Sequence, residues 1–210
     1  MEPHTFIEKK NMNHRMKTDI ILAGVGGQGI LSIATVMGIA ALEKKFSLKQ
    51  AEVHGMSQRG GAVQSHLRIS DKPIASDLIP LGKADLILSV EPMESLRYLS
   101  YLSSSGWLVT NETPFVNIPH YPDKEKILSA IRTLSRTILL PADQWAEECG
   151  TARASNMVML GAAIPFLPFT PEEMENAIRA IFAKKGEEIM EINLKAMKLG
   201  FSYAHSMTIL

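Results

Sequence analysis

The chain has 210 residues, enough for one domain with a full hydrophobic core. Its 22 Lys and Arg balance its 22 Asp and Glu, so no global positive field favours nucleic acid. Apolar residues make up 46% of the chain, which excludes wholesale disorder. The single cysteine, Cys149, excludes a disulfide framework and a four-thiolate zinc or iron–sulfur site held by this chain alone.

One stretch imitates an export signal or a membrane span, because residues 20–42 carry no charge and follow a basic segment. Glycines interrupt this stretch where an inserting helix needs continuity, at Gly24, Gly26, Gly27 and Gly29. We therefore expect neither export nor membrane insertion. A lone thiol in a chain with 12 Met fits a reducing cytoplasm.

Short apolar or alternating runs predict strands over 19–23, 49–53, 62–69, 84–90, 107–110 and 137–140. The alternation in 62–69 predicts a half-exposed strand, and after a turn at 71–73 we expect 74–78 to return antiparallel. Helices are predicted over 30–42, 124–134, 142–148, 156–163 and 187–204. Two further helices open at Pro92, carrying Leu96, Leu99 and Leu102, and after a capping box at Thr170–Glu173.

Strands alternate with helices at first and helices dominate later, which is typical of a three-layer α/β domain. We predict a Rossmann-like fold with a mostly parallel, mixed sheet and a helical C-terminal part. The antiparallel portion is a hairpin-like excursion near 62–78. Residues 18–204 form this single domain, after a disordered leader over 1–17 and before a tail over 205–210.

The segment Gly24-Val25-Gly26-Gly27-Gln28-Gly29 fits G-x-G-x-x-G between a predicted strand and a predicted helix. Glycines let the backbone approach an anion, and the helix N-terminus offers free N–H groups. The alternative is a tight turn without a ligand. A dinucleotide site also requires an acidic residue about 20 residues further along the chain, and Glu52 lies near that distance. A surface glutamate explains Glu52 equally well.

A second glycine-rich segment is His54-Gly55-Met56-Ser57-Gln58-Arg59-Gly60-Gly61. Its glycines predict a loop with unusual dihedral angles. Arg59 and Gly60-Gly61 would place a guanidinium and backbone N–H groups around one anion, while Ser57 and Gln58 add neutral donors and acceptors. The alternative is a solvated loop with an exposed arginine. His54 has no nearby Cys or Asp partner, so a structural or surface role is favoured over catalysis.

Three further residues have weaker signals. Glu91 stands at the carboxyl end of a predicted strand, where α/β folds place ligands, but it could equally stabilise the helix that follows. Asn156 opens an apolar helix, and its role as a cap is favoured. Cys149 lies beside Glu147 and Glu148, which would raise its pKa and make it a poor nucleophile. The histidines show no metal-ligand spacing, so no metal site is predicted.

With both glycine segments in place, the chain resembles the gamma subunits, or gamma domains, of 2-oxoacid:ferredoxin oxidoreductases over about residues 18–204. The loop 54–61 is similar to the arylpyruvate branch, represented by the small subunit of indolepyruvate:ferredoxin oxidoreductases. The pyruvate and 2-oxoglutarate branches tend to show a Tyr-Gly-Pro-Glu-Met-Arg-Gly-Gly type of loop instead. Residues 156–161 also fit the downstream pattern of the family, whereas the N-terminal leader departs from it.

The resemblance implies a division of labour within a complex. A large partner subunit would carry thiamine diphosphate with its Mg and the 4Fe–4S clusters, and the complex would pass electrons to ferredoxin. The composition agrees, because this chain has one cysteine and no Gly-Asp-Gly…Asn signature. The implied reaction turns arylpyruvate, CoA and oxidised ferredoxin into arylacetyl-CoA, carbon dioxide and reduced ferredoxin. We expect this chain to bind no cofactor alone, with CoA phosphates or the substrate carboxylate as candidate ligands of the two glycine segments.

Two alternatives stay open beside this hypothesis. A stand-alone NAD(P)-dependent oxidoreductase would use the same glycine motif and Glu52, but it needs a substrate-bearing half that 210 residues hardly supply. A ligand-free scaffold would use the glycines only to shape an interface. The sequence leaves open the preferred arylpyruvate, contact between CoA and this chain, and self-association.

Overall fold

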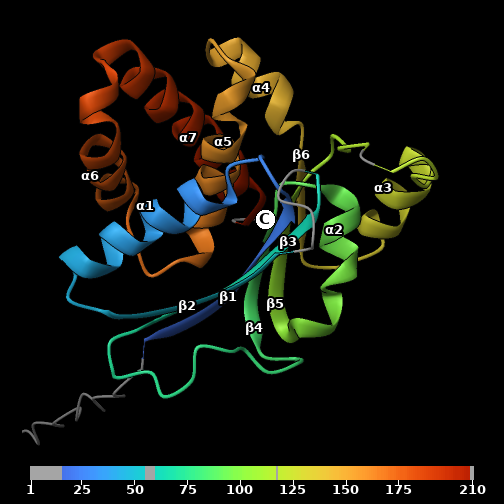
Figure 1. The fold of residues 1–210 in the computed structure, drawn as a ribbon, viewed down its shortest axis with the longest axis horizontal. Helices are drawn as coiled ribbons and strands as arrows, with labels where there is room; N and C mark the ends of the chain where they lie inside the picture. The colour runs from blue at the N-terminus through green and yellow to red at the C-terminus, as the bar shows by residue number, and fades with distance from the viewer. Residues whose placement is uncertain (1–15, 55–59, 117, 209–210) are drawn as a thin grey trace, which may run out of the picture.

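The computed structural model describes residues 16–54, 60–116 and 118–208, arranged around one central sheet (Figure 1). This sheet has six strands in the order β2-β3-β1-β4-β5-β6. β3 pairs antiparallel with both β1 and β2, whereas β1, β4, β5 and β6 pair in parallel. Five of the six described strands therefore share one direction, which confirms the predicted α/β fold with a mostly parallel, mixed sheet.

The strands are β1 (Lys17–Val25), β2 (Ser47–His54), β3 (Ala62–Ser70), β4 (Ala84–Ser89), β5 (Leu102–Asn111) and β6 (Thr137–Leu140). The α-helices are α1 (Ile30–Glu43), α2 (Pro92–Arg97), α3 (Lys124–Arg132), α4 (Ala142–Cys149), α5 (Ser155–Ala163), α6 (Pro171–Phe182) and α7 (Glu187–Thr208). Short 3₁₀ turns connect several of them, including η2 (Ala152–Ala154) and η4 (Ala183–Lys185).

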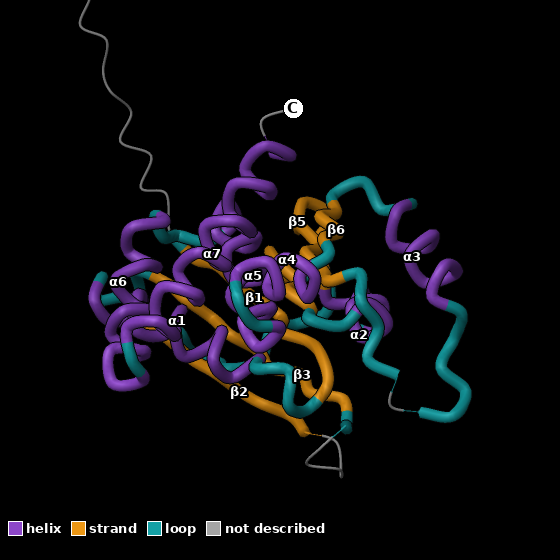
Figure 2. Tube along the Cα trace, turned by 90° about the horizontal axis from the view of Figure 1, so that it is seen from above, coloured by secondary structure: helices purple, strands orange, loops and turns teal. Residues whose placement is uncertain are grey.

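Helices cover both faces of the sheet, with α2 and α3 on one side and α1 and α4–α7 on the other (Figure 2). Alternate strand residues point to opposite faces, so Ile20 and Leu22 of β1 enter the core under α1 and α4–α7. Ile21, between them, enters the smaller core under α2 and α3. The helical C-terminal part thus forms most of one layer, and three layers result as predicted.

The segment after β3 differs from the prediction, because residues 74–78 form no strand. Arg68 instead donates to the carbonyl oxygens of Ser76 and Leu78, at 2.9 Å each. The N–H of Ile79 donates to Nδ1 of His66 at 3.0 Å. This loop covers the second face of β3, so the strand is less exposed than its alternation predicts, and burial lowers the pKa of His66. The antiparallel partner of β3 is β2, which precedes it.

Helix boundaries differ at several places. α2 ends at Arg97, and Leu102, expected on that helix, begins β5. Residues 205–208, expected in the tail, continue α7, and Lys17, expected in the leader, begins β1. The rest of the predicted leader, residues 1–15, lies outside the described residues. The capping box is confirmed, because the Thr170 hydroxyl accepts from the N–H of Glu173, and the Glu173 carboxylate accepts from the N–H of Thr170.

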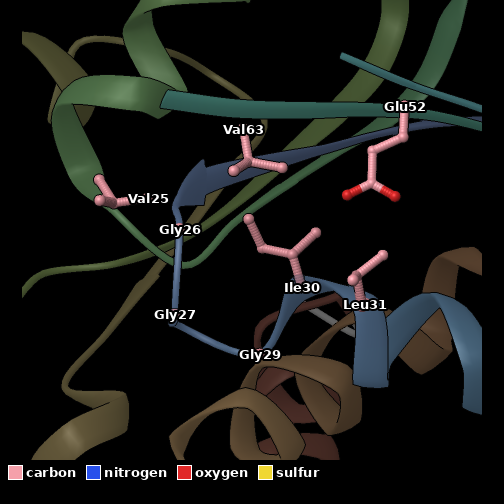
Figure 3. Close-up of a pocket in the computed structure, with 8 residues that line it drawn as sticks. All are labelled: Val25, Gly26, Gly27, Gly29, Ile30, Leu31, Glu52 and Val63. Carbon is pink, nitrogen blue, oxygen red and sulfur yellow. The ribbon is translucent and has the colours of Figure 1, made fainter. Parts of the chain in front are cut away.

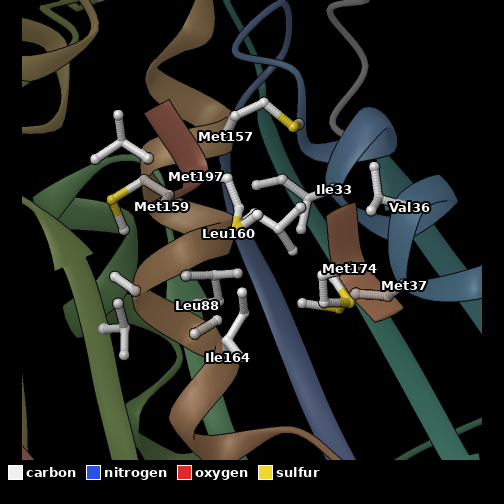
Figure 4. Close-up of a cluster of buried hydrophobic side chains, with 14 of the residues drawn as sticks. Ile33, Val36, Met37, Leu88, Met157, Met159, Leu160, Ile164, Met174 and Met197 are labelled. Carbon is white, nitrogen blue, oxygen red and sulfur yellow. The ribbon is translucent and has the colours of Figure 1, made fainter. Parts of the chain in front are cut away.

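α5 is buried between the sheet and α7, and its side chains fill the larger core together with those of α1 (Figure 4). Where α5 and α7 cross, glycines face each other's backbone. A Cβ atom on Gly161 would lie 1.9 Å from the carbonyl oxygen of Met197. A Cβ atom on Gly200 would lie 1.9 Å from the carbonyl oxygen of Val158. The crossing therefore requires glycine at both positions.

This crossing predicts the sign of one substitution. Replacing glycine by alanine in an ordinary helix stabilises it by about 1 kcal/mol. Gly200→Ala should instead lower the free energy of unfolding by roughly 1–3 kcal/mol or more, because the new Cβ collides with backbone that has no room to move. Urea unfolding of the purified chain, followed by circular dichroism, measures the change. Ser202→Ala, at an exposed position of the same helix, is the control and should stay within about 0.5 kcal/mol. A more stable Gly200→Ala variant would contradict the close crossing.

Candidate functional site

The first glycine segment forms the turn from β1 into α1, as predicted. Gly29 is the N-cap of α1 with φ 81°, and no side chain caps this helix. A Cβ on Gly24 would lie 2.4 Å from Cγ2 of Val90, and a Cβ on Gly29 would lie 2.4 Å from Nδ2 of Asn156. Gly27 has φ 104° and nothing within 4 Å of its Cβ position. Packing therefore explains Gly24 and Gly29, whereas Gly27 serves the turn and faces open space.

Gln28, a candidate ligand-binding residue, uses its side chain to close this turn. Its Oε1 accepts from the N–H of Val25 at 2.8 Å, and its Nε2 donates to the carbonyl oxygen of Val90 at 3.3 Å. Asn111 donates to the same carbonyl oxygen at 3.4 Å. These bonds attach the turn to the end of β4, so Gln28 shapes the site rather than presenting its amide to a ligand.

The two glycine segments meet in space. The N–H of Gly26 donates to the carbonyl oxygen of Gly61 at 2.9 Å, and the N–H of Gly60 donates back to Gly26 at 3.5 Å. These bonds engage two N–H groups that an anion would otherwise use, so an anion at this turn would have to be held by the first turn of α1. His54 ends β2. The remaining candidates Gly55, Met56, Ser57, Gln58 and Arg59 lie outside the described residues, so their roles stay predictions.

A cavity of about 280 Å³ opens beside this turn (Figure 3). Its walls are formed by Val25, Gly26, Gly27, Gly29, Ile30, Leu31, Glu52 and Val63. The carboxylate of Glu52 points from β2 into the space above the first turn of α1 (Figure 3). The remaining walls are apolar side chains and glycine backbone. A negative charge of the ligand would therefore favour the start of α1 over the surroundings of Glu52.

The position of Glu52 also bears on dinucleotide binding. In a doubly wound dinucleotide site, the strand that carries the acidic residue is the neighbour of the first strand. Here the antiparallel β3 lies between β1 and β2. Glu52 is thus displaced from β1 by two strand spacings, about 10 Å. Glu52 lines the cavity as the sequence suggested, but the sheet order disfavours the nucleotide geometry.

Glu91 is completely buried and holds two elements in place. As the N-cap of α2, its carboxylate accepts from the N–H of Glu94 at 2.7 Å. The same carboxylate accepts from the N–H of Phe115 at 3.3 Å and from the hydroxyl of Tyr121. Burial and this carboxylate together raise the pKa of Tyr121. The structure thus matches the helix-stabilising interpretation, and it adds a role in fixing the loop after β5.

Asn156 has a role that its position in the sequence does not reveal. It lies inside the first turn of α5, whose N-cap is Ala154, so the prediction of a cap is wrong. η2 leads directly into this helix and leaves no place for a side-chain cap. Nδ2 of Asn156 donates to the carbonyl oxygen of Gly29 at 3.3 Å. Asn156 therefore belongs to the site as a support of the glycine turn.

Cys149 is buried, and burial raises the pKa of its thiol, with Glu148 adding to the effect and Lys195 opposing it. The direction of the predicted shift is confirmed, although burial is the larger cause. Within the described ranges, no group of three or more His, Cys, Asp and Glu is arranged to hold a metal ion. In the same part of the chain, no helix combines the length and apolar character that a membrane span requires.

Solved structures share this fold. The gamma subunit of a keto/oxoacid ferredoxin oxidoreductase from Geobacter sulfurreducens has a TM-score of 0.65 and 24% identity, over 90% of this chain and 99% of its own. A 2-oxoglutarate:ferredoxin oxidoreductase from Magnetococcus marinus, with 2-oxoglutarate, coenzyme A and succinyl-CoA bound, has a TM-score of 0.72 and 21% identity. The likeness covers 90% of this chain but 31% of that longer one. The chain thus has the fold seen in these oxoacid:ferredoxin oxidoreductases.

Sequence relatives show the family. Residues 19–203 match the family described as pyruvate ferredoxin/flavodoxin oxidoreductase. Proteins named indolepyruvate oxidoreductase subunit IorB are similar along nearly their whole length. The one from Archaeoglobus fulgidus is 35% identical over 91% of this chain and 97% of its own, and the one from Pyrococcus horikoshii is 36% identical over 90% and 96%. The chain therefore belongs to the pyruvate ferredoxin/flavodoxin oxidoreductase family, which confirms the resemblance inferred from its two glycine segments.

The contacts of Gln28 predict that substituting this residue lowers the stability of the folded chain, in addition to any effect on ligand binding. Gln28→Ala should lower the free energy of unfolding by roughly 1–3 kcal/mol, because the N–H of Val25 loses its acceptor. Urea unfolding of the variant measures this loss. Gln144→Ala is the matched control, since Gln144 bonds to Glu148 on the exposed surface of α4 and should change stability by at most about 0.5 kcal/mol. Equal stabilities of the two variants would show that Gln28 does not hold the turn.

Proposed function

We propose that this chain is the small subunit of a cytoplasmic indolepyruvate:ferredoxin oxidoreductase. The observation that carries the proposal is its similarity to IorB proteins over about nine-tenths of both chains. The complex would convert an arylpyruvate, CoA and oxidised ferredoxin into the arylacetyl-CoA, carbon dioxide and reduced ferredoxin. This chain would contribute to binding and assembly, and the chemistry of bond cleavage would take place on a partner.

The cofactors of this reaction do not fit the residues of this chain. Thiamine diphosphate with Mg stabilises the carbanion left by decarboxylation, and 4Fe–4S clusters accept single electrons. The sequence has one cysteine, so it supplies no four-thiolate ligand set. We assign both cofactors to a large partner subunit, from which ferredoxin takes the electrons. Self-association of the assembled complex is compatible with this arrangement.

The residues of this chain would hold an anionic group of a substrate. The uncapped first turn of α1 presents N–H groups and a partial positive charge beside the glycine cavity. Gly60 and Gly61 are bonded to this turn, and we include Arg59, which precedes them in the sequence, in the proposed site. We assign CoA phosphates or the arylpyruvate carboxylate to this anion site. The carboxylate of Glu52 would repel the negative group and so direct it toward the start of α1.

The two alternatives are less well supported. A stand-alone NAD(P)-dependent enzyme needs an acid next to β1, but β3 intervenes between β1 and Glu52. A ligand-free scaffold draws support from Gly24 and Gly29, whose lack of a side chain is explained by packing. It leaves the uncapped helix start unexplained. Similarity to oxidoreductase subunits favours the enzyme complex over the stand-alone enzyme.

Purification of the tagged chain from its native cell, with oxygen excluded, tests the proposal. We expect a large brown partner to co-elute, containing thiamine diphosphate and iron–sulfur clusters. Visible absorbance, cofactor analysis and identification of the partner by mass spectrometry provide the readouts. A colourless chain that elutes alone would contradict the proposal, and calorimetric titration with NADH would then test the stand-alone alternative.

Arg59→Ala in the reconstituted complex tests the anion site. Loss of a hydrogen bond to a charged group should raise the KM for CoA or for arylpyruvate by about 10–100-fold. Arg132→Ala is the control, because Arg132 pairs with Glu125 on the exposed surface of α3. The scaffold alternative predicts weaker assembly with unchanged KM values. Unchanged KM values for both substrates in a fully assembled complex would remove Arg59 from the site.

A further inference from the structure

A second cavity of about 490 Å³ shares none of its lining residues with the glycine cavity. It is bounded by the first turn of α1, η2, the first turn of α5, the end of α6 with η4, and the start of α7. The polar and charged residues that line it include Ser32, Arg153, Asn156, Lys185, Glu188 and Asn193. Its size is within the range of about 300–1,000 Å³ that is usual for small-molecule sites.

Three helices begin at this cavity. Ser32 is the third residue of α1, Asn156 the second of α5 and Glu188 the second of α7. Each helix start carries a partial positive charge of about half a unit. α1 has neither an acidic residue in the first turn nor a side-chain cap to offset it. In contrast, η2 runs directly into α5 and is capped by Thr151, and α7 carries Glu187 and Glu188 in its first turn. The start of α1 is therefore the helix start that adds positive potential to this cavity.

Two cationic side chains add to this potential. Arg153 and Lys185 both line the cavity and are exposed. Among the residues that the structure describes, no carboxylate forms an ion pair with either of them, in contrast to Lys44, Arg97 and Arg179. Nζ of Lys185 lies 4.9 Å from the ring centre of Phe182, which itself lines the cavity. This cation–π contact restrains the ammonium group beside a ring of the cavity wall.

The other charged residue of the described lining is Glu188, so two full positive charges face one negative charge. Asn156 and Asn193 are buried, and each donates its amide to a backbone carbonyl oxygen, of Gly29 and Ile189 respectively. These two side chains form a polar part of the cavity wall whose position is fixed by hydrogen bonds. Phe182, Ile189 and Ile192 supply an apolar wall beside it. A ligand that fits combines a compact anion with an apolar group.

We propose that this cavity binds a phosphate monoester of a small, partly apolar molecule. Arg153 and Lys185 would contact the phosphate beside the first turn of α1, and the apolar group would lie against Phe182 and Ile192. The proposal needs this chain alone and is independent of the enzyme complex proposed above. Asn156 separates this site from the glycine turn, because its side chain lines the cavity and bonds to Gly29.

Nuclear magnetic resonance of the full-length chain tests this site, with inorganic phosphate and phenyl phosphate as probes at constant ionic strength. We expect saturable shifts of the backbone N–H signals of Ser32, Arg153 and Asn156 with both probes, and tighter binding of phenyl phosphate. The variant with Arg153→Ala and Lys185→Ala should bind at least about tenfold more weakly. Both positions are exposed, so the variant should keep its fold, which circular dichroism verifies.

Lys184→Ala is the matched control, because Lys184 is exposed in the same turn and does not line the cavity. It should bind both probes with unchanged affinity. Shifts confined to Gly27 and Ile30, or affinities that the double substitution leaves unchanged, would overturn the proposal. Neither result would bear on the proposed enzyme complex, which co-purification tests separately.

Discussion

The close crossing of α5 and α7 is the constraint on which both cavities depend. Because Gly161 and Gly200 have no side chains, the two backbones approach to a distance that any other residue would prevent. α5 consequently lies deep against the sheet, with its start directed at the glycine turn. There Asn156 bonds to the carbonyl oxygen of Gly29, at the point where α1 begins. The helix-packing core thus sets the position of the glycine turn, which forms part of the proposed site.

The glycine turn shows how a ligand motif and a packing requirement coincide. Gly24 is needed because Val90 and Ile30 lie against it, and Gly29 is needed because Asn156 lies against it. A turn of this form would therefore persist in a protein without a ligand. Gly27 is needed because its φ of 104° suits glycine. The helix start without a cap is the feature of this turn that neither packing nor backbone geometry requires, and it supports the proposed anion site.

Local signals in the sequence predicted most of the fold. Apolar runs placed all six described strands, and the capping box at Thr170 marked the start of α6 to the residue. The failures involve partners distant in the chain. Arg68 fixes residues 76–78 as a loop while it forms an ion pair with the buried Asp19, and no local pattern reveals this double role. Likewise, Asn156 resembles a cap locally, but its partner Gly29 is 127 residues away. Of the described site, the sequence pointed to the glycine turn but not to the side-chain amides of Gln28 and Asn156 that attach it to the end of β4 and to α5.

The charge distribution around the second cavity is unfavourable in the isolated chain. Helix starts are stabilised by acidic side chains and destabilised by cations, by up to about 1 kcal/mol each at the surface. Arg153 and Lys185 line this cavity together with Ser32 of the first turn of α1, and Glu188 is the one acid of the described lining. A chain with zero net charge has acids available elsewhere, yet none pairs with these two cations among the described residues. Binding of an anion would relieve this repulsion, and by linkage any ligand that prefers the folded chain also stabilises it.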